Sequence, residues 1–136
     1  MSDEKPVGIV LVSHSAEVAA AVAELARGLA GGGAVVPVAA AGGTEDGGLG
    51  TSAKLITAAA ASVDRGAGVA VLADLGSAVL TVKALLAEGD ELPDTARLVD
   101  APFVEGAVAA VVTAVTGADL DAVAAAAAEA YTYRKV

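Results

Sequence analysis

Short runs of β-branched residues alternate with longer segments rich in alanine and leucine, and this alternation constrains the fold more than any other feature. Residues 7–12, 34–40, 69–73 and 97–101 have the composition of strands, and the segments between them are long enough for helices. Strands that alternate with helices form parallel sheets with right-handed crossovers. The pattern predicts an open, mainly parallel α/β sheet of strand order 2-1-3-4, with helices on both faces.

Capping residues and glycines predict where the helices begin and end. Ser15 can cap a helix over residues 16–29, and the glycines at positions 31–33 would stop it. A helix ending before Gly89 should follow the turn at residues 74–77. The other expected starts are Thr51 or Ser52 for a helix to about residue 64, Pro102 at a first-turn position, and Asp119.

Charge and composition exclude several classes of function. The chain has 8 Lys and Arg residues against 17 Asp and Glu, and its net charge of −9 would repel nucleic acid. Aromatic residues make up 2% of the chain, too few to stack on bases. The absence of cysteine and the presence of one histidine exclude disulfides, thiolate metal sites and multi-histidine metal sites. We therefore expect no nucleic-acid partner, no metal and no other cofactor.

The length and the hydrophobic pattern favour a single protein domain away from membranes. A chain of 136 residues has the size of one domain, which we assign to residues 1–136 with an N-terminal tail over residues 1–6. Charged residues interrupt every apolar stretch before the roughly 18 residues that a spanning helix needs. Asp3 and Glu4 stand where a signal peptide would be basic. We expect a cytoplasmic protein.

Polar clusters follow the first three expected strands, at residues 13–15, 42–52 and 74–77. The carboxyl ends of parallel strands share one edge of the sheet, so these clusters should meet there. His14 is the candidate nucleophile, because an imidazole is mostly neutral near neutral pH. Asp74 could accept its N–H and fix the tautomer. The simpler alternatives are a surface histidine and a solvated turn carboxylate.

The glycine-rich loop at residues 43–52 suggests an anion site, since exposed N–H groups at helix N-termini attract phosphate. It lacks the Gly-Lys-Ser/Thr ending of a P-loop, and no GxGxxG motif follows the first strand. Two other classes of function are a regulatory α/β module that binds an anion or nucleotide without covalent chemistry, and a flavodoxin-like electron carrier. No aromatic residue stands at the strand edge to stack on a flavin, which argues against the electron carrier.

Four stretches of sequence carry a resemblance to a known family. They are IVLVSHSAEVAAAVAELA at residues 9–26, AAGGTEDGGLGTSA at 40–53, VLADLGSAVLTVKALL at 71–86 and DAPFVEGAVAA at 100–110. Together they resemble the phosphocarrier subunits of phosphoenolpyruvate-dependent dihydroxyacetone kinases. Those subunits belong with the enzyme IIA domains of the mannose-type phosphotransferase system. The resemblance extends from residue 7 to about residue 130.

This resemblance implies a phosphotransferase subunit that carries a phosphoryl group on His14, in a Val-Ser-His-Ser setting. The donor would be the phosphohistidine of HPr, and the acceptor would be ADP on the nucleotide-binding subunit of the kinase. A separate subunit binds dihydroxyacetone, so the sugar would be reached only indirectly. Asp74 takes the place of an aspartate that hydrogen-bonds the histidine in related domains. Either imidazole nitrogen could carry the phosphoryl group.

The resemblance also implies phosphate-binding residues and a dimer. Gly-Thr and Gly-Ser pairs of the family match Gly50-Thr51 and Gly76-Ser77 here. Some family members carry HPr-like and enzyme I-like domains on the same chain, whereas this one stops after the first domain and would need separate donors. Residues 131–136 could form an antiparallel strand exchanged across a homodimer. The candidate phosphate-binding residues are Ser15, Gly43, Thr44, Gly50, Thr51, Gly76 and Ser77.

Overall fold

The computed structural model of the protein describes residues 5–31 and 35–136. Most of the expected N-terminal tail, the expected helix stops at Gly32 and Gly33, and the expected strand start at Ala34 lie outside these residues. The described elements are β1 (Gly8–Ser13), α1 (Ala16–Ala30), β2 (Val38–Gly42), α2 (Ala53–Val63), β3 (Val69–Ala73), α3 (Gly76–Glu88), β4 (Ala96–Leu98), α4 (Phe103–Val115), α5 (Leu120–Glu129) and a 3₁₀ turn at Ala130–Thr132.

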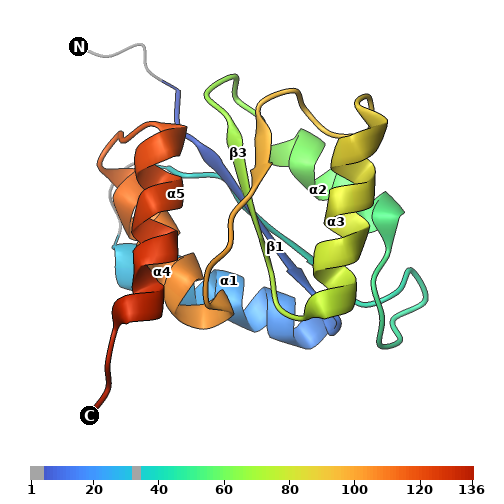
Figure 1. Cartoon of the computed structure of the whole chain (residues 1–136), viewed down its shortest axis with the longest axis horizontal. Helices are drawn as coiled ribbons and strands as arrows, with labels where there is room; N and C mark the ends of the chain where they lie inside the picture. The colour runs from blue at the N-terminus through green and yellow to red at the C-terminus, as the bar shows by residue number, and fades with distance from the viewer. Residues whose placement is uncertain (1–4, 32–34) are drawn as a thin grey trace.

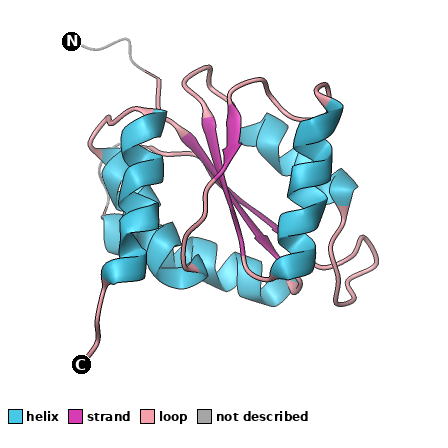
Figure 2. Ribbon diagram, viewed as in Figure 1, coloured by secondary structure: helices cyan, strands magenta, loops and turns pink. Residues whose placement is uncertain are grey.

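The four described strands form one parallel sheet in the order β2-β1-β3-β4. The strands run side by side through the middle of the molecule, and helices lie around them (Figure 2). Each connection between parallel strands contains a helix, as parallel pairing requires. The α/β class, the strand order and the central position of β1 are confirmed.

Alternate residues of β1 point to opposite faces of the sheet and build two separate cores. Ile9 and Leu11 pack with α1, α4 and α5 on one face, whereas Val10 and Val12 pack with α2 and α3 on the other. Figure 1 shows α4 and α5 on one side of the strands and α2 and α3 on the other. Burying each such side chain contributes roughly 1.5–3 kcal/mol. None of the helices in the described residues is long and apolar enough to span a membrane.

Three of the helices begin at the polar residues that the sequence predicts. The side chains of Ser15, Ser52 and Asp119 accept hydrogen bonds from the backbone N–H three residues later, at 3.2, 3.1 and 2.9 Å. Of the two expected caps for α2, it is therefore Ser52 and not Thr51 that caps the helix. Pro102 is the cap residue of α4 and lies just before its first turn.

The second strand begins and ends later than the expected range of residues 34–40. Pro37 has no N–H, and its carbonyl accepts the N–H of Ile9 at 2.9 Å, so the pairing with β1 starts there. At the other end, Gly42 pairs with Ser13. A Cβ atom at position 42 would lie 2.4 Å from the backbone oxygen of Ser15. A glycine expected in a loop is thus the last residue of a strand.

The fourth strand is shorter than the expected range of residues 97–101 and ends at Leu98. Val99 still donates its N–H to the carbonyl of Val71 at 2.8 Å. The neighbouring strand β3 ends at Ala73, and Pro102 has no N–H to continue a ladder. The chain therefore leaves the sheet before α4 begins.

The C-terminal residues form a short turn and then an exposed tail that extends away from α5 (Figure 1). The hydroxyl of Tyr131 donates a hydrogen bond to Asp100 Oδ1 at 2.7 Å. The ammonium of Lys135 pairs with the carboxylate of Glu105 on α4. Exchange of residues 131–136 between two chains stays a prediction.

Candidate active site

The strand register brings the candidate residues to one edge of the sheet. Ser13 is level with Gly42 of β2, and Val12 is level with Ala73 of β3. The residues that follow these strands therefore leave the sheet at the same height. His14 and Asp74 meet there although 60 positions separate them in the sequence.

The imidazole of His14 is held from both of its nitrogen atoms. Nδ1 lies 2.9 Å from Asp74 Oδ1, and Nε2 contacts the hydroxyl oxygen of Ser77. A carboxylate can only accept, so the Nδ1 atom carries the hydrogen of the neutral ring and Nε2 keeps its lone pair. The side chain of His14 is 25% exposed, so its Nε2 edge can be reached by a second molecule.

Asp74 accepts two hydrogen bonds on each carboxylate oxygen. Its Oδ1 atom faces the imidazole and the backbone N–H of Leu75 at 2.7 Å. Its Oδ2 atom faces the hydroxyl of Ser13 at 2.8 Å and the backbone N–H of His14 at 3.2 Å. Burial raises the pKa of the carboxyl group, but these hydrogen bonds outweigh it and hold the pKa below its usual value of 3.8. Asp74 is therefore a fixed anion at neutral pH.

The glycine-rich loop supports the backbone around the histidine. Gly50 donates its N–H to the carbonyl of His14 at 2.9 Å, and Gly43 donates to the carbonyl of Ser13 at 3.0 Å. The hydroxyl of Thr44 accepts the N–H of Gly48 at 2.9 Å and donates to the side chain of Asp46. The N–H groups of Gly43 and Gly50 and the hydroxyl of Thr44, which were expected to bind phosphate, thus form hydrogen bonds within the loop and to the backbone of Ser13 and His14.

Two other expected phosphate ligands have different surroundings. The hydroxyl of Ser15 caps α1 by accepting the N–H of Val18. The hydroxyl oxygen of Thr51 is buried and has no hydrogen-bond partner among the described residues. Neither hydroxyl contacts the imidazole in the part of the chain that the structure describes.

Gly76 and Ser77 form the first turn of α3 beside the histidine. The cap residue of this helix is Leu75, whose side chain offers no hydrogen bond to the first N–H groups. Unpaired N–H groups and the helix dipole make such a helix start attractive to an anion. An anion bound to Nε2 of His14 would lie next to this helix start, because Ser77 already contacts that atom.

The sequence places Ser13 in the polar cluster at this edge, but it assigns no role to its side chain. Among the described residues, Ser13 is the one polar residue that is buried, with 1% of its surface exposed. A serine that ends an otherwise apolar strand, directly before the histidine, is the signal that could have identified it. Its contact with Asp74 depends on pairing across 61 positions, which the sequence does not show directly.

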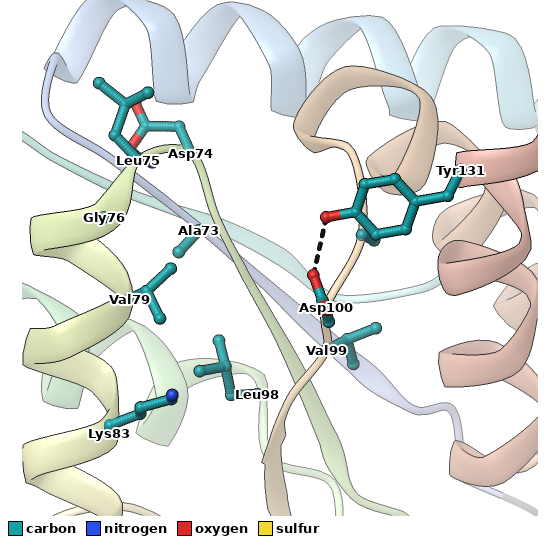
Figure 3. A pocket seen from close by; sticks show the side chains of 11 residues that line it. Ala73, Asp74, Leu75, Gly76, Val79, Lys83, Leu98, Val99, Asp100 and Tyr131 are labelled. Atoms are coloured by element: carbon teal, nitrogen blue, oxygen red, sulfur yellow. Dashed lines mark hydrogen bonds between the residues drawn. The ribbon is translucent and has the colours of Figure 1, made fainter.

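A cavity of about 400 Å³ adjoins the site between α3 and the segment that leads from β4 to α4. Asp74 and Gly76 line its upper end in Figure 3, with Lys83 and Leu98 lower down and Tyr131 on the opposite side. His14 and Ser77 do not line it. The cavity therefore adjoins the histidine site and shares Asp74 and Gly76 with it.

Among the described residues, one group of acidic side chains has the spacing of metal ligands. Glu88, Asp90 and Glu91 lie at the end of α3, whereas Ser77 lies at its start. All three are exposed, as solvated acidic residues commonly are. They lie away from the histidine.

Comparison with known proteins places this arrangement in a family. Residues 8–124 match the family model EIIA-man, described as PTS system fructose IIA component. The chain is 34% identical over 118 residues to the phosphoryl donor subunit DhaM of PEP-dependent dihydroxyacetone kinase 2 from Listeria innocua, covering 86% of this chain and 93% of that protein. It is 39% identical over 120 residues to the Escherichia coli DhaM, covering 86% of this chain but 25% of the relative. The resemblance seen in the four sequence motifs is confirmed.

Solved structures show the same fold. The crystal structure of a protein described as of unknown function, EF1359, superposes with a TM-score of 0.77 at 32% identity, covering 92% of this chain and 95% of that chain. A sigma-54 interaction domain protein from Enterococcus faecalis superposes with a TM-score of 0.60 at 17% identity, covering 89% of this chain and 87% of that chain. At that identity, the second likeness concerns the fold alone.

Proposed function

Because the chain belongs to the EIIA-man family of phosphotransferase-system IIA components, we propose that it carries a phosphoryl group on His14 as the donor subunit of a phosphoenolpyruvate-dependent dihydroxyacetone kinase. The observation that carries the proposal is the hydrogen bond between His14 Nδ1 and Asp74 Oδ1. It leaves the Nε2 lone pair as the nucleophile, on the exposed side of the ring. The names of the Listeria and Escherichia relatives support the dihydroxyacetone kinase system.

The chemical step needs no base, because the attacking nitrogen carries no proton. Nε2 of His14 attacks the phosphorus of a donor phosphohistidine, and an Nε2–P bond forms as the N–P bond of the donor breaks. The electron pair of the broken bond returns to the donor imidazole. Asp74 keeps the Nδ1 proton in place and stabilises the positive charge that develops on the ring. In the second step a β-phosphate oxygen of ADP attacks the same phosphorus, and the Nε2 lone pair is restored.

The start of α3 would stabilise the phosphoryl oxygens during both steps. The hydroxyl of Ser77 contacts Nε2 in the free protein, and it must turn towards the phosphoryl oxygens once the Nε2–P bond forms. The N–H groups of Gly76 and Ser77 would bind the same oxygens at the positive end of the helix dipole. Gly43 and Gly50 would act indirectly, by fixing the backbone of Ser13 and His14.

We assign the remaining partners from the family. The proposed donor is the phosphohistidine of HPr, and the proposed acceptor is ADP bound to the nucleotide-binding subunit of the kinase. The dihydroxyacetone-binding subunit would meet this chain only indirectly. Residues 1–136 would act as one domain, as a homodimer and in the cytoplasm. The whole relay is a proposal, since the chain spans 25% of the length of the Escherichia coli relative.

A relay assay tests the function. The protein is first phosphorylated with phosphoenolpyruvate, enzyme I and HPr, freed of the donors, and then mixed with the ADP-loaded nucleotide subunit. We expect ATP to form on that subunit in proportion to the phosphoprotein added, and none with His14→Gln. Tight binding of ADP or phosphate to this chain without covalent labelling would favour the regulatory module instead.

A further inference from the structure

Ser13 has a buried hydroxyl group that donates its one hydrogen bond to Asp74. Its side chain lies at the end of β1 with 1% of the residue exposed, out of reach of any donor or acceptor protein. The Ser13 oxygen lies 3.1 Å from the backbone nitrogen of Ser15 and 2.8 Å from Asp74 Oδ2. A backbone N–H can only donate, so the Ser13 hydroxyl accepts a hydrogen bond from Ser15 and donates one to Asp74.

This bond determines how the carboxylate of Asp74 is oriented. A carboxylate can turn about its terminal torsion, which is broad and roughly two-fold. The Ser13 hydroxyl holds Oδ2 at 2.8 Å while the N–H of Leu75 holds Oδ1 at 2.7 Å, and in this orientation Oδ1 faces the imidazole at 2.9 Å. The backbone N–H of His14 also reaches Oδ2, but at the longer distance of 3.2 Å. The shorter of the two contacts to Oδ2 therefore comes from Ser13.

We propose that Ser13 is a positioning residue for phosphoryl transfer, which acts through Asp74 and forms no bond to the phosphoryl group. The inference rests on the proposed function and adds a residue to it. With the hydroxyl present, the carboxylate plane is fixed, the Nδ1–H tautomer of His14 dominates and Nε2 keeps its lone pair. Without it, the carboxylate loses one of its hydrogen bonds and turns more freely. The tautomer with hydrogen on Nε2 then gains population, and that tautomer cannot attack phosphorus.

The size of the effect follows from other oriented imidazoles. In metal sites, removing the side chain that hydrogen-bonds and orients a metal-bound histidine commonly lowers activity about 10-fold to 100-fold. We use this range as a guide for His14, which is also oriented by a hydrogen bond. The N–H groups of His14 and Leu75 still contact the carboxylate when Ser13 loses its hydroxyl. We therefore expect Ser13→Ala to lower the maximal rate of phosphorylation about tenfold. The concentration of phospho-HPr that gives the half-maximal rate should not change, because Ser13 is buried.

The experiment compares serine variants by two independent measurements. His14 is the single histidine of the chain, so nitrogen NMR of the imidazole reports its tautomer without ambiguity, in unphosphorylated protein and without any donor. The rate of phosphorylation by phospho-HPr is the second measurement. The variants are Ser13→Ala, Ser13→Thr, which keeps a hydroxyl, and Ser13→Cys, which fills the space with a weak donor. Ser62→Ala is the matched control, because its hydroxyl bonds the carbonyl of Ala59 at the far end of α2.

We expect Ser13→Ala to show more of the Nε2–H tautomer together with the slower transfer, Ser13→Thr to restore both, and Ser62→Ala to match the wild type. Ser13→Cys should lie between wild type and alanine, and it decides the question if the alanine variant does not fold. An unchanged tautomer in a folded Ser13→Ala or Ser13→Cys protein would overturn the inference, even if its melting temperature fell. If wild type itself accepts no phosphoryl group, the proposed function fails, while the tautomer measurement still decides the role of Ser13.

Discussion

At the scale of single residues, the two ends of one imidazole have different partners. Nδ1 of His14 faces a carboxylate that accepts two hydrogen bonds on each oxygen, and Nε2 faces a hydroxyl at the start of a helix. The first contact selects the tautomer, and the second lies where a phosphoryl group would be held. This asymmetry supports the proposal that His14 accepts a phosphoryl group on Nε2.

The carboxylate of Asp74 should be needed for transfer, while a variant without it should still fold. We expect Asp74→Ala to slow phosphorylation by roughly two to four decades, because loss of the orienting group lets the wrong tautomer dominate. The rate is measured by quenched-flow transfer from phospho-HPr. Asp64→Asn is the matched control, since Asp64 is an acidic residue that accepts the N–H of Gly66 beyond the end of α2. Equal slowing in both variants would exclude a specific role for Asp74.

The low pKa of Asp74 also predicts how stability changes in acid. In the folded protein the pKa of the Asp74 carboxyl lies below its usual value of 3.8, so the ionised carboxylate stabilises the folded state above pH 3.8. This contribution is lost as the pH falls through the lower pKa of the folded state. The free energy of unfolding of the wild type, relative to Asp74→Asn, should therefore decrease below pH 3.8. A difference that grows in that range would contradict the assignment.

At the scale of secondary-structure elements, sequence patterns located the apolar strands and the side-chain caps well. Residues 69–73 are buried on both faces and form β3 as expected, and Ser15 caps α1. The predicted bounds of β2 were wrong at positions where glycine or proline fits either a strand or a loop. Gly42 looked like part of a loop but allows β2 to pass close to α1, and only the three-dimensional contact reveals this. Pro102 fixed the start of α4 to within one residue.

Gly42 and Gly28 give opposite predictions for the same substitution to alanine. A Cβ atom at position 42 would meet the backbone oxygen of Ser15 at 2.4 Å, so Gly42→Ala should destabilise the protein by about 1–3 kcal/mol. It should also slow phosphorylation, because Ser15 follows His14. A Cβ atom at Gly28 meets nothing within 4 Å, and alanine in a helix should stabilise by roughly 0.5–1 kcal/mol.

Urea unfolding of the two glycine variants, measured side by side, checks this prediction. The Gly28→Ala protein also serves as the control for any general effect of adding a methyl group. If Gly42→Ala were as stable as Gly28→Ala, then the close approach between β2 and the start of α1 would not constrain the fold.

At the scale of the whole molecule, the parallel sheet places residues that are distant in sequence at one edge. That His14 and Asp74 meet could be predicted, because both follow strands that end at the same height. The role of the glycine-rich loop at residues 43–52 could not be predicted in the same way. Gly50 was expected to hold phosphate, but its N–H bonds the carbonyl of His14, a contact that depends on how the loop folds back. Ser13 was expected at this edge, but its contact with Asp74 depends on pairing across 61 positions, which the sequence does not show.

The C-terminal tail carries the prediction of a dimer. Residues 133–136 are exposed and have no regular structure, and β4 is an edge strand of the sheet. We expect that deletion of residues 131–136 converts a dimer into a monomer in light scattering. Lys135→Ala is the milder control, which removes one ion pair with Glu105 but keeps the residues that would be exchanged. An unchanged mass after the deletion would exclude tail exchange.

The most direct test of the central claim is the intact mass of the protein after incubation with phosphoenolpyruvate, enzyme I and HPr. We predict the mass of one added phosphoryl group on the wild type, lost in acid and retained in base, as expected for a phosphorus–nitrogen bond. The His14→Gln protein should gain no mass. An acid-stable adduct, or labelling that survives His14→Gln, would contradict the account and point to a hydroxyl of Ser15 or Ser77.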